Sequence, residues 1–500
     1  MALPQGGPWP PSPHGIALQQ MALWSAWWIG DPEGLSSVYG AVGGGATSDF
    51  FANRQGGVIP TLARFFWGRP SVTGQRKTRL HVPLAADIAT ASADLLFSEP
   101  PQFIVDGNAN AEARADEIMN VGTLHSELLE AAEACSALGG GWLRLVWDTD
   151  VADHVMLDTV PADSAIGEWR WGHLSAVTFF TETRNEKTVT RHLERHEPGR
   201  ILHGLYSGDD KKLGQPMALA DHPSTAPYAD LVDEEGAIPT GVEGLTATYA
   251  ANMRPQRRWR KIQSLSELGR SDFDGVEQLM DALDETYTSW MRDIRLAKAR
   301  LVVPEFMLND LGKGQGAAWD EDQEIYSALN MQPNASGDTI TAKQFKIRTK
   351  DHKDTSVQIV NDILRSAGYS QSTLDADSEG ALTATEVVAR EQTSARTRAK
   401  KTRYWSQALD PLLTTWLELD AVVFKTRAQG EVTVQWPDSS QPDREALART
   451  VNALNQAAAV STDTKVRMVH TDWNEEEILR EVERVQAETG MAVPDLGPLA

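Results

Sequence analysis

The sequence predicts an α+β fold that is mainly helical, on three observations. Apolar residues recur on one helical stripe, at a period of about 3.6, from Val276 to Ile294. Between residues 142 and 206, β-branched and aromatic residues instead form short alternating runs separated by Asp, Asn, Gly or Pro. A second long helical pattern covers residues 385–419. Long helices and a separate block of short strands are typical of the α+β class.

Length and composition are those of a folded protein with several regions. A chain of 500 residues exceeds what one hydrophobic core usually supports. Apolar residues make up 41% and charged residues 23%, which is ordinary for a globular protein. No apolar run approaches the ~18 residues that span a bilayer, so we expect no membrane partner. The N-terminus, MALPQGGPWPPSPHG, lacks the features of a secretory signal and is predicted to be a flexible arm.

Charge and cysteine content exclude several classes of function. The 70 acidic and 47 basic residues give a net charge of −23. Affinity for a phosphate backbone comes from Lys and Arg, so we do not expect nucleic acid to bind over the whole surface. The single cysteine, Cys135, excludes an internal disulfide and fits a reducing cytoplasm. It lies in a helical pattern, where a buried structural thiol is a better interpretation than a nucleophile.

The first third of the chain predicts three helices. The Trp-rich stretch MALWSAWWIGDPEGL indicates a short helix that ends at Gly30 and Pro32, with its aromatic rings buried rather than forming a binding surface. The stretch 81–101, HVPLAADIATASADLLFSEPP, is rich in small residues, so other backbones can approach the helix closely, and Pro100 with Pro101 stops it. Residues 110–138 are predicted to form one further helix.

An antiparallel meander is predicted after three consecutive glycines at 139–141. Its expected strands are 142–147, 154–160, 174–183, 189–196 and 201–206. Residues 207–253 show no clear period and are interpreted as a variable insertion on that sheet.

The second half returns to helices. Residues 274–300 predict a rod of roughly 40 Å, with Asp272 or Asp274 as its N-cap. Short strands are expected within 301–352, and a shorter helix runs over 353–366. A polar loop then leads to the helix at 385–419. The remaining segments are predicted to form one strand, EVTVQW, and two helices, DREALARTVNALNQAAA and NEEEILREVERVQAE.

This order of elements, together with four local stretches, resembles portal proteins, the head-to-tail connectors of long-tailed double-stranded DNA bacteriophages. The stretches are HVPLAADIATASADLLFSEPP, RHLERHEPGRILHGLYSG, SDFDGVEQLMDALDETYTSWMRDIRLAKARLVVPEF and VQWPDSSQPDREALARTVNALNQAAAVSTDT. None of them is a catalytic signature, so the resemblance depends on their number and order.

The resemblance implies a division of the chain into the regions of a portal subunit. Residues 1–272 would be the wing with its N-terminal arm, 273–300 and 353–367 the stem, 301–352 the clip, 368–384 a channel loop, 385–420 a long wing or spine helix, and 421–500 the crown. The insertion at 207–253 has no counterpart in this scheme.

The resemblance also implies a function and partners. The protein would form a homododecameric ring at one capsid vertex of the virion, after assembly in the host bacterial cytoplasm. Double-stranded DNA would pass through the ring during packaging and ejection, without sequence-specific contacts. The ring would nucleate the procapsid and dock the terminase large subunit and the head-tail connector or adaptor, beside the major capsid and scaffold proteins. An acidic surface that repels DNA suits such a conduit.

Three charged clusters are the candidate sites. The channel loop contains Asp375, Asp377 and Glu379. The spacing of these carboxylates is superficially that of a calcium loop, but the EF-hand pattern is incomplete. We therefore predict a mobile acidic loop that touches DNA loosely. The clip acids are expected to dock the terminase, and they are Asp320, Glu321, Asp322 and Glu324. A basic cluster on the long helix could contact DNA phosphates or a neighbouring subunit, and it comprises Arg390, Arg396, Arg398, Lys400, Lys401 and Arg403. The same two alternatives hold for the basic residues around Trp259, namely Arg254, Arg257, Arg258, Arg260 and Lys261.

No catalysis, cofactor or metal is predicted. The chain has neither a G-x-x-x-x-G-K-[ST] loop nor a G-x-S-x-G elbow, so hydrolysis is expected in a partner ATPase. His192 and His196 flank Glu194 in RHLERH, but the pattern is that of a strand and not of an HExxH helix. Two alternative functions stay open: a metal-dependent hydrolase or nuclease that uses the acidic clusters, and a capsid or adaptor protein without a channel.

Overall fold

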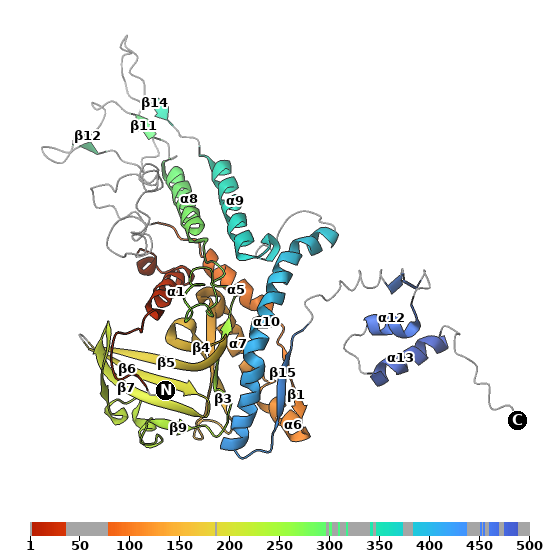
Figure 1. The fold of residues 1–500 in the computed structure, drawn as a ribbon. Coiled ribbons are helices and arrows are strands. Elements are labelled where there is room, and N and C mark those ends of the chain that lie inside the picture. Colours follow the sequence, from red (N-terminus) through yellow and green to blue (C-terminus); the bar gives the residue numbers. More distant parts are fainter. Residues whose placement is uncertain are drawn as a thin grey trace, which may run out of the picture. The chain divides into compact units, whose positions relative to one another are not determined.

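The computed structural model confirms the α+β class (Figure 1). It describes residues 3–36, 79–185, 188–296, 300–302, 309–310, 317–318, 341–343, 347–373, 384–437, 451–452, 454–455, 460–469 and 475–488. The chain divides into two compact units, Met1–Trp436 and Pro437–Ala500. No helix among these residues is both long and apolar enough to cross a membrane.

Three helices form the first layer of the core, and the sequence predicts the first two of them. They are α1 (His14–Ile29), α5 (Leu84–Phe97) and α7 (Gly122–Leu138). The small residues of α5 are buried against its neighbours, because a helix without bulky side chains lets other backbones come close. Trp24 and Trp27 are almost fully buried, so the aromatic cluster is core.

The N-terminal arm is not the flexible segment that its Pro and Gly content predicts. Trp9 is only 6% exposed. Its backbone N–H donates to the carbonyl of Lys211 at 2.8 Å, and its ring meets Phe180 edge-on at 5.3 Å. The buried ring of Trp9 and the backbone hydrogen bonds of residues 7 and 9 hold the arm on the sheet.

The single helix predicted over 110–138 is wrong, because the chain forms two. The first is α6 (Ala109–Ile118), and Asn108 caps it by accepting a hydrogen bond from the N–H of Ala111 at 2.8 Å. Its neighbour α7 begins only at Gly122. Between them, Asn120 bonds the backbone of Phe103 in β1 (Gln102–Gly107) through both its oxygen and its nitrogen, so the break serves a tertiary contact.

The predicted meander is divided between two antiparallel sheets. The first has the order β10-β2-β3, with β2 (Gly140–Val146), β3 (Met156–Pro161) and β10 (Ala247–Ala251). The second has the order β4-β5-β6-β7-β8, and β9 pairs with β7. Its strands are β4 (Ala165–Arg170), β5 (His173–Asn185), β6 (Thr188–Glu197), β7 (Arg200–Asp209), β8 (Lys212–Met217) and β9 (Ala237–Pro239).

Residues 207–253 are therefore not an insertion appended to the sheet. They supply β8, β9 and β10, and Tyr249 of β10 is the register partner of Trp142 in β2. A pairing across about a hundred residues leaves no periodic signal in the sequence, which explains the wrong prediction.

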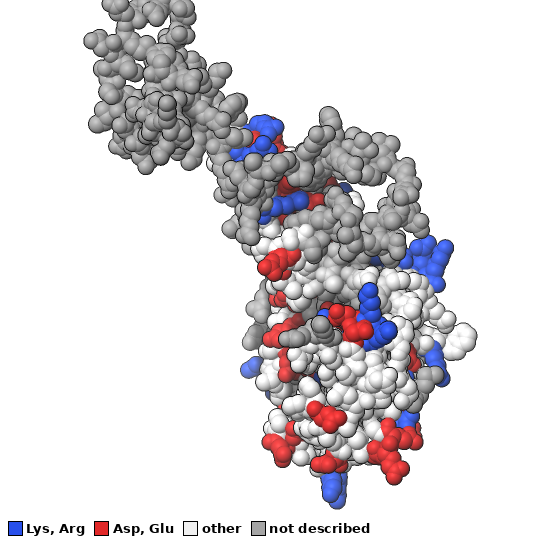
Figure 2. All heavy atoms as spheres, turned by 90° about the vertical axis from the view of Figure 1, so that its left-hand side faces the viewer, with Lys and Arg blue, Asp and Glu red and all other residues white. Residues whose placement is uncertain are grey.

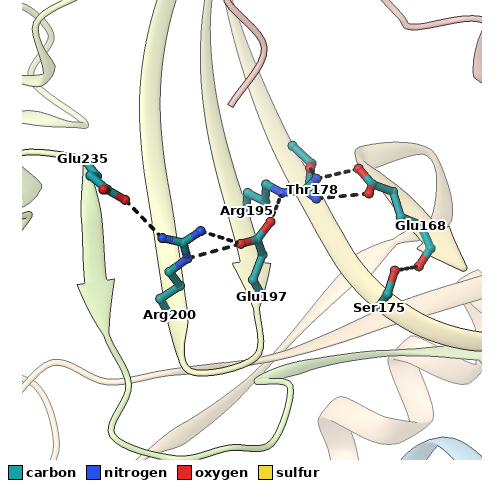
Figure 3. A network of polar contacts seen from close by, with 7 residues as sticks. All are labelled: Glu168, Ser175, Thr178, Arg195, Glu197, Arg200 and Glu235. Carbon is teal, nitrogen blue, oxygen red and sulfur yellow. Dashed lines mark hydrogen bonds and ion pairs between the residues drawn. The ribbon is translucent and has the colours of Figure 1, made fainter. Parts of the chain in front are cut away.

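Charged side chains link the strands of the larger sheet (Figure 3). The guanidinium of Arg195 on β6 donates to both carboxylate oxygens of Glu168 on β4, at 2.6 and 3.0 Å, and to Glu197 at 2.8 Å. Arg200 on β7 donates to Glu197 and, at 3.2 Å, to Glu235. Arg195 is buried, so loss of its carboxylate partners would leave an uncompensated charge inside the sheet.

Two helices lie side by side beyond these layers (Figure 1): α8 (Glu277–Leu296) and α9 (Thr349–Ala367). They correspond to the predicted rod and its returning partner. The short strands β11 (Arg300–Val302) and β14 (Thr341–Lys343) pair, as do β12 (Asn309–Asp310) and β13 (Ala317–Ala318). The short 3-10 turn η5 (Gln371–Thr373) follows α9.

The long helix α10 (Ala384–Val423) matches the prediction closely. It packs against α5, β10 and β15 (Gly430–Gln435), and β15 pairs with β1 in antiparallel register. Residues 421–436 thus belong to the first compact unit. In the second unit, α12 (Thr462–Val469) and α13 (Glu475–Glu488) meet through Val466, Ile478 and Val482.

Candidate functional site

A buried polar cluster lies where α5, α7, α9 and α10 meet the segment that leads into α8. We call it the joint, and it consists of Ser92, Ser136, Asn252, Asp272, Tyr369 and Lys401. Asp272 is 6% exposed and Lys401 1% exposed. The joint connects the paired helices α8 and α9 to the rest of the first unit.

Every oxygen of the central carboxylate has a donor. One oxygen of Asp272 accepts from the hydroxyl of Ser136 at 2.6 Å and from that of Tyr369 at 2.8 Å, and the other accepts from the amide of Asn252 at 2.8 Å. The ammonium of Lys401 forms an ion pair with Asp272 and donates to the hydroxyl of Ser92 at 2.6 Å. A buried charge pair is tolerated only when additional hydrogen bonds satisfy its remaining donors and acceptors in this way.

The electrostatics of the joint favour an ionised Asp272. Burial opposes its charge, but the neighbouring Lys401 ammonium and the hydrogen bonds outweigh burial and hold its pKa below the ordinary value. Burial and the Asp272 charge together raise the pKa of Tyr369 well above its ordinary value, so the phenol stays a hydrogen-bond donor. Burial likewise raises the pKa of Cys135 to about 12, which makes it the inert thiol that the sequence predicts.

A second set of contacts fixes α8 beside the joint. Arg79 forms an ion pair with Asp281 and donates to its carbonyl at 2.6 Å. The fully buried carboxylate of Asp284 accepts from the N–H of Val82 at 2.8 Å and lies 3.0 Å from Nδ1 of His81. The chain entering α5 is therefore tied along one side of α8.

The two helices are also linked to each other. The rings of Trp290 on α8 and His352 on α9 are stacked, with an interplanar angle of 8° and centroids 6.1 Å apart. Asp293 lies 3.0 Å from both Arg348 and His352. With the joint at one end and these contacts farther along, α8 and α9 form a braced pair.

The basic residues predicted as one cluster on α10 differ in how exposed they are. Arg396, Lys400 and Arg403 are exposed on α10. Arg398 is half-buried and donates to the carbonyl of Leu95 at 2.6 Å. Lys401 is a correction: it points into the joint, so it is not on the surface that a DNA or subunit contact requires.

The remaining predicted site residues lie outside the described parts. They are the side chain of Arg390, a residue of α10, and the two acidic clusters, Asp320, Glu321, Asp322, Glu324 and Asp375, Asp377, Glu379.

Residues His192, Glu194 and His196 lie on one face of a strand, β6, as predicted. The side chains that could bind a metal are already bonded within the fold. Arg144 forms an ion pair with Glu194 at 2.9 Å, and Nε2 of His196 lies 2.8 Å from the Glu194 carboxylate. His192 is 3.1 Å from Nδ1 of His203. Within the described residues, no group of three His, Cys, Asp or Glu side chains is arranged to hold a metal.

This histidine cluster predicts acid sensitivity of the first unit. Burial lowers the pKa of His203 from 6.5 to about 4, with the Arg144, His192 and His196 charges acting in the same direction and Glu194 opposing them. Burial also lowers the pKa of His192. Because the unfolded chain binds these protons first, stability is lost as the pH falls from about 6.5 to about 4.

The loss from His203 alone is expected to be about 3 kcal/mol, at about 1.4 kcal/mol per pKa unit. Urea unfolding of the wild type and of His203→Gln at pH 7 and pH 4.5 checks this. The variant should lose clearly less stability between the two pH values, and an equal loss in both proteins would contradict the assignment.

Sequence reasoning missed the joint. It assigned Asp272 as a possible helix cap and Lys401 to a surface cluster. One signal was present: Ser92 and Ser136 interrupt the apolar faces of two helices, and buried hydroxyls need partners.

In the described residues, the polar groups of the joint connect elements of the fold to one another. Residues 72–495 match the family model "Phage portal protein, SPP1 Gp6-like", and the chain belongs to this family. The resemblance found in the sequence is thereby confirmed. No curated protein sequence matches the chain.

Three of the solved structures that are similar to this chain come from gene transfer agent (GTA) particles. The virion of the native particle has a chain 11% identical, covering 82% of this chain and 99% of its own, with a TM-score of 0.36. In the neck of the native particle, computed with C12 symmetry, a chain is 10% identical, covers 83% of this chain and 95% of its own, and has a TM-score of 0.40. In the neck of the empty particle, computed with C6 symmetry, a chain is 12% identical, covers 80% of this chain and 95% of its own, and has a TM-score of 0.42. Such distant similarity carries no argument about this chain.

Proposed function

We propose that the protein is a portal subunit that assembles into a ring at one capsid vertex. Double-stranded DNA enters and leaves the capsid through this ring, which also nucleates the procapsid. The observation that carries the proposal is the family match over residues 72–495. Ring assembly in the host cytoplasm and a final place in the virion follow from the same role.

The braced pair supports self-association. Ile294, Ile347 and Val357 on and beside α8 and α9 are 41%, 36% and 42% exposed. Isolated apolar residues are common on surfaces. In the proposed ring, neighbouring copies would cover these three side chains, of which Ile294 and Val357 lie on the helices and Ile347 just before α9. A closed ring covers both sides of each subunit without leaving an open edge.

The charge supports passage of DNA without tight binding. A net charge of −23 disfavours adhesion of a polyanion. On the face drawn in Figure 2, the acidic and basic side chains of the described residues form small separate groups with uncharged areas between them. In this proposal, Asp375, Asp377 and Glu379 repel the passing duplex.

The energy for DNA movement is assigned to a partner. The terminase large subunit is proposed to dock near Asp320, Glu321, Asp322 and Glu324, and the head-tail connector or adaptor to follow it when packaging ends. The family is structural rather than enzymatic. A metal-dependent nuclease would lose its activity when the acidic clusters are changed to amides, whereas a portal would keep its ring.

Genetic complementation tests the proposal. A phage that lacks this gene should recover DNA-filled heads with the wild-type protein but not with Ile294→Asp/Val357→Asp, in which each subunit is folded but self-association is impaired. The matched control is Leu231→Asp, which places the same charge at an apolar residue 62% exposed on another part of the fold. Heads that fill normally without the protein would refute the proposal. Heads that fill equally well with both variants would refute only the part of α8 and α9 in self-association.

A further inference from the structure

The chain between β8 and β9, residues 218–236, is a loop that we call the flap. It contains two short 3-10 turns, η2 (Leu219–Asp221) and η3 (Ala226–Tyr228). Within this range, which the structure describes completely, Thr225 is the only buried residue. Its hydroxyl donates to the carbonyl of Leu219 at 2.6 Å, so this contact also stays inside the flap. The flap therefore holds its own shape but inserts no apolar side chain fully into the core.

A few contacts attach the flap to the larger sheet. At its end, the carbonyl of Gly236 accepts from the N–H of His203 on β7 at 2.8 Å, and Arg200 donates to Glu235 at 3.2 Å (Figure 3). At its start, η2 lies beside β7. In its middle, the half-buried ring of Tyr228 is stacked on the imidazole of His203, with centroids 4.4 Å apart and an interplanar angle of 15°. Tyr228 thus ties the middle of the flap to the sheet.

Two imidazoles that share a hydrogen bond lie against this tyrosine. Nε2 of His192 is 3.1 Å from Nδ1 of His203, and the two rings are nearly parallel, with centroids 5.4 Å apart. The ring of Tyr228 is stacked on His192 as well, at 5.6 Å. A neutral imidazole has one donor and one acceptor nitrogen, whereas an imidazolium has two donors. The bond between the rings therefore exists only while at least one of them is neutral.

The surroundings of the pair oppose a second positive charge. The groups whose charges act on the two rings and on Tyr228 are Glu194 and His196 on β6, Arg144 on β2, His222 in the flap and Asp148 in the β2–β3 turn. Of these, Glu194 favours protonation of both rings, but it is already bonded to Arg144 and His196. Burial lowers the pKa of both histidines, so both rings are neutral at pH 7.

One proton on the pair is compatible with the closed flap, but two are not. An imidazolium can donate to a neutral imidazole, and an aromatic ring such as that of Tyr228 attracts a single cation against its face. Two protons turn an N–H of each ring toward the other and place two like charges in rings only 5.4 Å apart. One ring must then leave the stack, and Tyr228 loses its support on the sheet.

We infer that residues 218–236 are an acid-released flap: the neutral pair of His192 and His203 holds Tyr228 on the sheet, and charging both rings lets the flap lift while the rest of the first unit stays folded. Lifting uncovers the two histidines on β6 and β7, so acid changes the surface that this part of the subunit offers to a partner. The inference concerns one subunit and does not depend on the proposed ring.

Hydrogen exchange of the full-length protein tests the inference. It is read by mass spectrometry from pH 7 to pH 4, with labelling times scaled to the intrinsic exchange rate at each pH. The amides of 218–236 should lose roughly tenfold or more of their protection over this range, while those of α5 and α10 keep theirs. The slope of the loss against pH should approach two protons, because both rings must be charged before the flap lifts.

Variants of the pair and of the tyrosine separate this mechanism from general acid damage. In His203→Gln and in His192→Gln, one titrating ring remains, so the slope should fall to one proton or fewer, whatever the protection at pH 7. The matched control is His173→Gln, which changes an exposed histidine on β5 of the same sheet and should behave as the wild type. Tyr228→Ala should leave the flap unprotected already at pH 7, whereas Tyr228→Phe keeps the stacked ring and should change little.

Three results would overturn the inference. The first is a wild-type flap that stays protected at pH 4. The second is loss of protection in α10 at the same pH as in the flap, since acid then opens the whole unit. The third is a slope that is the same in the wild type and in both glutamine variants, because the histidine pair then does not control the flap. None of these results bears on whether the protein forms a ring.

Discussion

Replacing Lys401 with methionine is expected to lower the free energy of unfolding by about 3–5 kcal/mol, because the substitution leaves the buried charge of Asp272 without its counterion. The methionine fills much of the same volume, so packing changes little. The hydrogen bonds from Ser136, Asn252 and Tyr369 remain, but they do not neutralise the carboxylate. The expected result is a large fall in the urea midpoint at pH 7.

Two further variants isolate the ion pair. Lys400→Met is the matched control, because Lys400 is the adjacent residue of α10 but is exposed; it should change stability by less than about 0.5 kcal/mol. Lys401→Met combined with Asp272→Asn should recover part of the loss, since the buried charge is then removed with its partner. If Lys401→Met and Lys400→Met are equally stable, the joint does not hold the fold.

Truncation of Trp405 to alanine is expected to cost about 3–5 kcal/mol, because it opens a cavity in the larger core. The ring of Trp405 is 1% exposed and meets Phe97 edge-on with centroids 5.0 Å apart. This contact joins α10 to the end of α5, so the cavity would separate two elements that also carry the joint.

Guanidinium unfolding of three variants checks this prediction. Trp405→Phe should cost clearly less than Trp405→Ala, since most of the buried area is kept. Trp171→Asn should be neutral or should stabilise the subunit, because it removes an exposed ring and relieves a left-handed conformation. Equal losses for Trp405→Ala and Trp171→Asn would contradict the assignment of Trp405 to the core.

Local pattern was a reliable guide where one periodic signal decides the structure. The stripe of α8, the small residues of α5 and the alternation of β5 to β7 each report burial of one face, and the structure has these elements. The break between α6 and α7 escaped prediction because apolar residues continue through it, and it depends on Asn120 reaching the distant β1. The pairings of β1 with β15 and of β10 with β2 could not be predicted either, because a strand partner far along the chain leaves no periodic pattern in the local sequence.

The charged residues were harder to interpret than the apolar ones. A basic stretch on α10 reads as one surface, yet Lys401 points inward while Lys400 points outward, because adjacent residues of a helix face ~100° apart. Only the position of α10 against the segment containing Asp272 decides which lysine is buried. Spacing on a helix can show which residues share a face, but not which face the rest of the fold covers.

The molecular mass of the purified full-length protein in solution, measured by native mass spectrometry over a range of concentrations, tests the central claim most directly. We expect one closed assembly with a fixed number of identical subunits and, in electron micrographs of the same sample, an open centre. A protein that stays monomeric at every concentration, or that forms only open chains of variable length, would contradict the account.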